Sequence, residues 1–485
     1  MRRTVVSMAR FPLRRALLLA ATALLTAGVA FGAYSLLGRR EVTTSSAEAY
    51  RFYKLGRENE LKMYYKEAMA AYAEALARDS HFVMATVRLA AHLRERDPER
   101  AKVLMDGISS YRESVTKREQ LKIRLYEAMW EKKDPNEAES LVNEFVKQYP
   151  EDPDAYLERA QFHLKLDRPK EATADFETLL RLNPNYALAY NSLGYFSLAV
   201  GEYAKAEDYL KRYRFLAPDQ ANPYDSLGEF YATVGRYDEA EESLRKALQI
   251  KPDFFPAQGH LGTVAAGRGD ARAAADHFRR AAELADSPGM RAEFGWLAAV
   301  VLANAGLRDE ALKQIEGVEA PKPTEGASAA DKNRAEARLL HRKAVFLALL
   351  GRAEEAAALL GVLEPLLLDR ASETASEKES VARDLAAIRG LIAEARGRHA
   401  EAAEFLGKAI PVQLQSHGFG YLQGEPLRRT RWARNLALAG RTDEAEAAMR
   451  PVLARNPNFA PALAVAAEFR LKMPASAEGA ASAAR

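Results

Sequence analysis

The chain has 485 residues, of which 48% are hydrophobic and 28% charged, so it is long enough for several conventional domains or for one long repeat array. Its formal charge of +3 comes from the first forty residues, which hold seven arginines and no acid. Taking those seven from the 70 basic residues leaves 63 against 67 acidic ones, a net charge of −4. The remainder therefore offers no bulk electrostatic argument for nucleic acid as a partner. The absence of cysteine excludes disulfides and cysteine-ligated zinc.

An uncharged stretch of 23 residues, 16–38, follows the basic residues 1–15. About 20 apolar residues cross a bilayer as a helix, so length favours a transmembrane anchor over a cleaved signal peptide, whose apolar core has about 7–15 residues. The small-residue stretch Ala30-Phe31-Gly32 keeps cleavage open. Five arginines precede the stretch and two follow it, and the positive-inside rule then puts residues 1–15 in the cytoplasm. The predicted localisation is a bacterial inner membrane, with one membrane pass and the remaining chain in the periplasm; secretion to the periplasm after cleavage is the alternative.

A short polar linker, 39–48, leads into a region where small and bulky residues recur. The first copy combines Leu55-Gly56 with Ala68-x3-Tyr72, and two weaker copies follow it. From 153 to 288 the spacing is regular, with alanines 34 residues apart at Ala172, Ala206, Ala240 and Ala274. The best copy reads Tyr224-x2-Leu227-Gly228-x2-Tyr231, then Ala240-x3-Leu244, then Pro252.

These offsets resemble the tetratricopeptide repeat, a helix–turn–helix unit of 34 residues. The small residues stand where two helices touch, the bulky ones fill the space between pairs, and proline ends the second helix. The resemblance covers about residues 49–470, most strongly 153–288. It implies an all-α, right-handed superhelical solenoid of helix hairpins, whose concave face usually takes a peptide or a partner helix. Such a fold does not by itself fix a function.

A second register extends the repeat toward the C-terminus. A glycine stands five residues before the packing alanine in seven successive units, where it suits a left-handed turn just past a helix end: Gly201, Gly235, Gly269, Gly306, Gly351, Gly397 and Gly440. Beyond Ala274 the alanine spacing lengthens to 37, 45, 46 and 43 residues. The predicted divisions are a repeat array over 49–318, a loop over 319–335, divergent repeats with a capping helix over 336–470, and a disordered tail over 471–485.

No catalytic site is predicted. The sequence has no HExxH, no G-x-x-x-x-G-K-[ST] and no G-x-S-x-G motif. The glutamates that precede the packing alanines suit the first turn of a helix, where the helix dipole favours an acid. We therefore predict that the protein is not an enzyme and that it holds neither a cofactor nor a metal.

The predicted binding surface is the inward face of the first helix in each regular unit. Helical phase places eight residues there: Leu157, Gln161, Leu164, Asn191, Tyr195, Leu198, Asp225 and Glu229. This mixture suits a peptide or helix with apolar and basic character, and an ordinary solvated groove is an equally open interpretation. The positions carry no basic cluster, so the carboxylate-binding groove known from some tetratricopeptide proteins is not indicated. A separate basic patch, Arg428-Arg429-x-Arg431-x2-Arg434 with Trp432, suits an acidic partner or polyanion, although a solvated helix face is the favoured interpretation.

The predicted function is a non-catalytic protein–protein interaction scaffold of the bacterial cell envelope. It would bind peptides or helices of envelope-complex components and reach the membrane through its N-terminal helix, with no nucleic acid partner expected. The alternatives are an envelope assembly or quality-control chaperone, and an accessory subunit of a membrane enzyme or polysaccharide-export complex. The sequence leaves the oligomeric state and the partner open.

Overall fold

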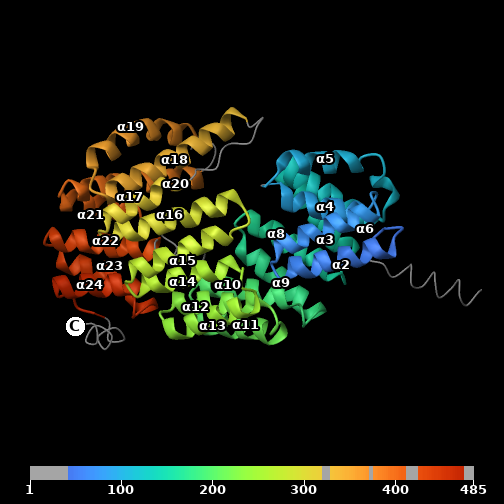
Figure 1. The fold of residues 1–485 in the computed structure, drawn as a ribbon, viewed down its shortest axis with the longest axis horizontal. Coiled ribbons are helices and arrows are strands. Elements are labelled where there is room, and N and C mark those ends of the chain that lie inside the picture. Colours follow the sequence, from blue (N-terminus) through green and yellow to red (C-terminus); the bar gives the residue numbers. More distant parts are fainter. Residues whose placement is uncertain (1–41, 95, 319–327, 371–374, 411–423, 474–485) are drawn as a thin grey trace, which may run out of the picture. The chain divides into compact units, whose positions relative to one another are not determined.

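A computed structural model of the chain describes residues 42–94, 96–318, 328–370, 375–410 and 424–473. Within these ranges the protein consists of helices joined by turns, and no strand occurs in them (Figure 1). Consecutive helices pack in pairs, and the first helix of a pair also contacts the first helix of the next. This confirms the predicted fold class, an all-α, right-handed superhelical solenoid of tetratricopeptide-like hairpins.

The helices fall into two compact units, which are described separately. The first comprises residues up to Arg57 together with Ala68–Asp134, and the second comprises Glu58–Glu67 together with Pro135 onward. Residues 47–131 form α2 (Ala47–Leu61), α3 (Tyr65–Arg78), α4 (Val83–Leu93), α5 (Pro98–Ile108), the short turn η1 (Arg112–Ser114), α6 (Lys117–Tyr126) and the π-helical turn η2 (Glu127–Glu131).

The polar segment before α2 is held in place by two buried or half-buried acids. The backbone N–H and Oγ1 of Thr43 donate to Glu119 at 2.8 and 2.6 Å, and Glu119 also forms a capping box with Thr116 at the start of α6. Thr44 Oγ1 donates to Asp79 at 2.6 Å, and Val42 is buried. Residues 39–41 of the predicted linker lie outside the described residues. The rest of it is shorter than the predicted bounds, because α2 begins at Ala47.

The second unit begins with regular hairpins of nearly equal length. They are α7 (Pro135–Gln148), α8 (Pro153–Lys165), α9 (Pro169–Leu182), α10 (Ala187–Ala199), α11 (Tyr203–Leu216), α12 (Ala221–Thr233), α13 (Tyr237–Ile250), α14 (Phe255–Gly267) and α15 (Ala271–Leu284). Hairpins of more variable helix length and a final helix follow: α16 (Pro288–Asn304), α17 (Arg308–Glu316), α18 (Ala329–Leu349), α19 (Ala353–Arg370), α20 (Ala375–Ala395), α21 (His399–Lys408), α22 (Glu425–Leu438), α23 (Thr442–Arg455) and α24 (Ala460–Phe469).

A close glycine contact joins the two helices in three of the regular hairpins. A Cβ added to Gly228 of α12 would lie 2.5 Å from Leu244 Cγ of α13, far inside van der Waals contact. Leu244 and Ala240 have no exposed surface, and full burial of a leucine side chain stabilises by about 1.5–3 kcal/mol. The same contact recurs between Gly194 and Leu210 and between Gly262 and Phe278. The small residue at this position therefore sets how closely the helix axes approach.

The glycine that ends each first helix has the predicted left-handed backbone. Gly235 has φ +80°, its N–H donates to Ala232 at 3.3 Å, and the next N–H, of Arg236, donates to Tyr231 at 2.8 Å. This pair of bonds satisfies carbonyls that the helix end leaves open. All seven glycines of the register have positive φ, between 73° and 83°. The turn register predicted from sequence is confirmed.

The divergent half differs from its predicted divisions at two places. Helix α18 begins at Ala329, so the loop predicted over 319–335 extends too far; residues 319–327 lie outside the described residues. Leu471, placed in the predicted disordered tail, is buried, and the Lys472 N–H donates to Glu446 at 2.7 Å. The tail from 474 lies outside the described residues. The predicted capping helix, Ala460–Phe469, is α24.

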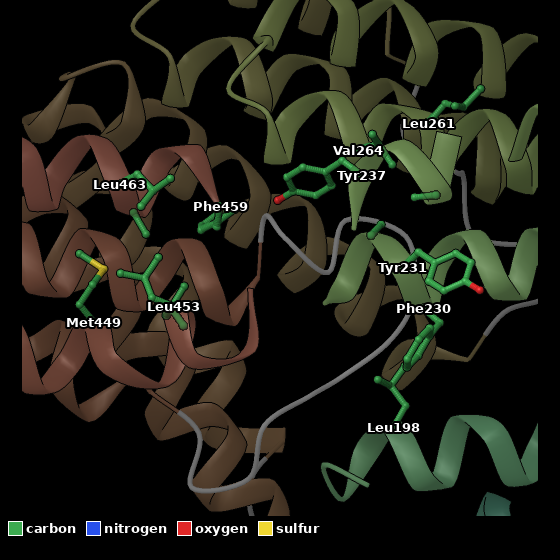
Figure 2. Packing of buried hydrophobic residues seen from close by; sticks show 14 of the residues in the cluster. Leu198, Phe230, Tyr231, Tyr237, Leu261, Val264, Met449, Leu453, Phe459 and Leu463 are labelled. Carbon is green, nitrogen blue, oxygen red and sulfur yellow. The ribbon is translucent and has the colours of Figure 1, made fainter. Parts of the chain in front are cut away.

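Within the second unit, the last hairpin packs back against α12 and α13. Asn456 Nδ2 donates to Ala232 O at 3.3 Å and to Tyr237 Oη at 3.0 Å, and Asn458 Nδ2 donates to Gly235 O at 3.0 Å. Figure 2 shows Tyr237 directed toward Phe459, which lies in the turn between α23 and α24, and both residues belong to one apolar cluster. We call this contact, made by Asn456, Asn458 and Phe459, the closure. It joins segments that are 219 residues apart in the sequence.

Candidate partner-binding surface

The predicted groove residues lie on the first helices α8, α10 and α12, as helical phase required, but they differ in exposure. Gln161 and Leu164 of α8 are exposed, and Tyr195 of α10 is partly exposed. The other five are buried: Leu157, Asn191, Leu198, Asp225 and Glu229. Leu157 and Leu198 belong to the apolar clusters of the hairpins, which makes packing their role in this structure. No contact tests partner binding by the set, which stays a prediction.

Four polar side chains from three successive first helices meet on the inner face. Tyr195 Oη of α10 donates to Glu229 Oε2 of α12 at 2.6 Å. His260 of α14 lies 2.8 Å from Asp225 Oδ1 through Nδ1 and 3.5 Å from Glu229 Oε2 through Nε2. We call these four residues the polar cluster. They bond to one another across the repeats. Fewer of their polar atoms can therefore bind a partner.

The charges of the polar cluster are set by burial and by its own acids. Burial lowers the pKa of His260, but Asp225 and Glu229 outweigh it and bring the pKa to about 9. Burial raises the pKa of Asp225, and His260 opposes that rise. The pKa of Tyr195 is raised well above its usual value, first by burial and then by Glu229. At neutral pH His260 is therefore a buried imidazolium beside Asp225 and Glu229.

A cavity of about 400 Å³ opens on the inner face of the divergent half. It is lined by the first helices α16, α18, α20 and α22, with Leu406 of α21 at its edge. Its apolar lining includes Trp296, Leu297, Val300, Val345, Leu391 and Leu427. A volume of this size lies in the range of sites that bury a ligand or a few partner side chains, about 300–1,000 Å³. Sequence analysis missed this cavity.

Charged side chains share the cavity wall with these apolar groups. Arg342 of α18 pairs with Glu293 of α16. Arg431 of α22 donates to Glu394 Oε1 at 2.9 Å and to Asn304 Oδ1 at 2.7 Å. His341, Asp384 and Arg428 complete the polar lining. Burial lowers the pKa of His341, which keeps its imidazole neutral at pH 7.

The basic patch predicted around Arg428 is divided among separate partners. Arg429 bonds to the buried Glu425, Arg431 to Glu394, and Arg434 to Glu468 at 3.1 Å. Arg428 instead lines the cavity. Trp432 lies against Gly407, whose added Cβ would be 3.2 Å from the indole ring. Three of these arginines are therefore paired with separate acids, and binding of an acidic partner by the patch stays a prediction.

Metal binding finds no support in the part of the chain that the structure describes, where no group of three or more His, Asp or Glu residues is arranged to hold an ion. The predicted localisation needs correction. Across the described ranges, no helix is both long enough and apolar enough to cross a membrane. The predicted anchor, 16–38, lies outside the described residues, as do residues 1–15.

Comparison with known proteins identifies the repeats. Family profiles described as tetratricopeptide repeat match residues 128–174, 163–221 and 221–254. This chain carries tetratricopeptide repeats. The profiles thus cover α7–α13, and the structure shows the same hairpins continuing beyond them. No curated protein sequence matches the chain.

Solved structures of tetratricopeptide proteins are similar over parts of the chain. The crystal structure of MamA is 26% identical, covers 33% of this chain and 93% of its own, and has a TM-score of 0.29. YrrB, described as a TPR protein with an unusual peptide-binding site, is 21% identical, with coverages of 36% and 89% and a TM-score of 0.27. The Cut9–Hcn1 assembly is 18% identical, with coverages of 93% and 82% and a TM-score of 0.46. A tetratricopeptide scaffold of this kind is typically non-catalytic.

His260 and the cavity are the features that sequence reasoning did not find. His260 stands one residue outside the groove register, and its two acidic neighbours come from the preceding repeat. The sequence signal that could have indicated this contact was an acid pair, Asp225 and Glu229, with a histidine near the next groove position. The cavity lies between the first helices of four successive hairpins, and the lengthened repeat spacing after Ala274 was the available sequence signal.

Proposed function

We propose that this protein is a non-catalytic interaction scaffold that binds a peptide or helix of a partner protein on the concave face of its solenoid. The cavity between α16, α18, α20 and α22 carries the proposal. Four successive first helices contribute to it, and it combines an indole and several aliphatic side chains with charged groups. Apolar anchors surrounded by a few polar groups are the usual composition of a recognition site.

The regular repeats support a smaller contribution to binding. Gln161 and Leu164 are exposed on α8, and Tyr195 is partly exposed on α10. The buried acids beyond them are held by His260. A partner segment would therefore meet a shallow surface on the regular repeats and a deeper site in the divergent half. The narrower assignment to a bacterial envelope complex has no support among the described contacts, and the proposal stops at protein binding.

Site-specific photo-crosslinking in cells of the source organism tests the proposal. A photoreactive phenylalanine analogue at Leu297 places the probe in the cavity. The same analogue at Val362 of α19 is the matched control, because Val362 is 55% exposed and lies outside the cavity lining. We expect a small, constant set of partner proteins at Leu297 and not at Val362.

The outcomes separate the alternatives. A broad mixture of unfolded clients at Leu297 would favour a chaperone over a scaffold. Equal crosslinking at both positions would contradict a binding site in the cavity. A third probe at Gln161 asks whether the regular repeats touch the same partner. Turnover of a substrate by purified protein, lost on Trp296→Ala substitution, would overturn the non-catalytic proposal.

A further inference from the structure

The charges around the cavity are unevenly paired. Its lining carries three guanidinium groups, of Arg342, Arg428 and Arg431, against the carboxylates of Glu293 and Asp384. Arg342 is neutralised by Glu293, and Arg431 by Glu394 at the cavity margin. The remaining charged groups are Arg428 on α22 and Asp384 on α20.

Among the described residues, the guanidinium of Arg428 makes no hydrogen bond and no ion pair within 4.0 Å, although the residue is half-buried. The nearest candidates are otherwise engaged or too distant. Glu425, one helical turn before it, holds Arg429 and Arg455. Asp384 acts on Arg428 only through the longer-range electrostatic field. A half-buried guanidinium with no direct counter-ion is costly, and an incoming anion would remove that cost.

The lowered pKa of Arg428 agrees with this geometry. Burial dominates it, even though Asp384 and Glu425 both favour the charged form and Arg383 disfavours it. His341 adds no charge at pH 7, because burial lowers its pKa as well. The cavity therefore presents one cation without a direct counter-ion beside an apolar wall that includes Trp296 and Leu427.

We propose that the cavity recognises a partner segment in which a carboxylate lies next to a bulky apolar side chain, with Arg428 binding the carboxylate. This inference rests on the proposed function and names the chemistry of the partner. The guanidinium fork offers two parallel N–H donors, which match the two oxygens of a carboxylate. Trp296 and Leu427 would receive the apolar side chain. The carboxylate could belong to an Asp or Glu side chain or to a chain terminus, and the experiment separates these sources.

The test measures binding of defined peptides to the full chain. An array of apolar hexapeptides is synthesised in three forms: with one internal Glu and an amidated end, with Gln at that position and an amidated end, and with Gln and a free terminal carboxylate. We expect wild-type protein to bind a carboxylate form about tenfold or more tighter than the neutral form, the gain of a charge-assisted hydrogen-bonded pair. Preference for the first or the third form identifies the source of the carboxylate.

Matched variants assign the preference to Arg428. Arg428→Gln is expected to abolish the preference, and Arg428→Lys to retain part of it because a point charge remains without the fork. Arg434→Gln is the control, since Arg434 lies on the same helix, pairs with Glu468 and is outside the cavity lining. Asp384→Asn is expected to strengthen binding of the acidic peptides, because it removes the opposing carboxylate.

Stability measurements separate recognition from a structural role. We expect Arg428→Gln to unfold at the same temperature as wild type or higher, because it removes an uncompensated charge. If Arg428 instead supports the fold through Asp384, both Arg428→Gln and Asp384→Asn would lower the unfolding temperature, which would overturn the inference. Equal binding of acidic and neutral peptides, lost on Trp296→Ala, would overturn the inference and leave the proposed function intact. No binding of any peptide would contradict both.

Discussion

The polar side chains on the inner face are paired differently in the regular repeats, α8–α15, and in the divergent repeats, α16–α22. In the regular repeats, Tyr195, Glu229, His260 and Asp225 bond to one another across three helices. In the divergent repeats, a cavity separates the inner helices, and Arg428 has no direct counter-ion among the described residues. The first region uses its polar groups to hold the solenoid together. The second leaves one without a direct counter-ion, which we propose binds a partner.

The hairpins themselves do not explain this difference, because both regions build them alike. Gly390 of α20 lies against Leu406 of α21, with an added Cβ 2.7 Å from Leu406 Cγ, as Gly228 lies against Leu244. The inner helices differ in length: α10, α12 and α14 have 13 residues, whereas α18 and α20 have 21. We infer that length beyond the shared hairpin contact lets the inner faces diverge and open the cavity.

The largest expected effect concerns the protonation of His260. Its pKa in the folded chain is about 9, against about 6.5 for an unfolded histidine. Because the folded value is higher, the stabilisation is complete below about pH 6.5 and is lost as the pH rises through 9. A shift of this size corresponds to a free energy of unfolding on the order of 3 kcal/mol. Urea unfolding at pH 6, 7.5, 9 and 10 measures it.

The control for this pH dependence is His260→Gln, which keeps a polar side chain but cannot take the charge. Its free energy of unfolding is expected to fall less between pH 6 and 10 than that of the wild type. Parallel curves for the two proteins would show that His260 is neutral in the folded state. The polar cluster would then be an ordinary hydrogen-bond network, and its contrast with the cavity would weaken.

The second effect tests the close hairpin contact. Gly228→Leu places a side chain where Leu244 already lies, and overpacking of this kind destabilises by about 1–3 kcal/mol. Gly361 of α19 is the matched control, since no neighbouring atom lies within 4 Å of its added Cβ. Gly361→Ala is expected to stabilise by up to about 1 kcal/mol, because alanine favours a helix interior. Thermal unfolding followed by circular dichroism measures both, and a loss of stability in both would contradict the packing argument.

The third effect tests the closure. Asn456→Ala leaves the Ala232 carbonyl and the Tyr237 hydroxyl without the amide that binds them, a loss of about 1–2 kcal/mol. Hydrogen exchange should increase in α12, α13 and α24 and stay unchanged in α8 and α9. Asn183→Ala, in the corresponding turn after α9, is the control because Asn183 donates no side-chain bond across the solenoid. A uniform increase along the whole array would mean that the closure does not act locally.

The periodic parts of this structure could be predicted from sequence, and the long-range parts could not. The turn glycines and the contact of Gly228 with Leu244 follow from the spacing of residues within one hairpin. The same spacing recurs in successive repeats. The contacts of His260 were not predicted, because its partners Asp225 and Glu229 lie in another repeat, one position off register. The contact of Asn456 with Tyr237 was harder still to predict, because it depends on the summed curvature of the intervening hairpins. The burial of Leu157 and Leu198 shows that helical phase alone does not distinguish groove residues from core residues.

The smallest effect concerns the arginine that follows the turn glycine in both regions. Arg352 binds Glu355 in the divergent half, as Arg236 binds Glu239 in the regular half. Arg236 also reaches Glu207 at 2.9 Å and lies over the Tyr231 ring at 4.3 Å, whereas within the part of the chain that the structure describes Arg352 pairs only with Glu355. Exposed single pairs stabilise little, and a network with an aromatic contact stabilises more. We therefore expect Arg352→Ala to leave the thermal unfolding midpoint unchanged and Arg236→Ala to lower it slightly. Equal midpoints for the two variants would show that the regular repeats gain nothing from linking their turns, and that the difference between the two regions lies in their inner faces alone.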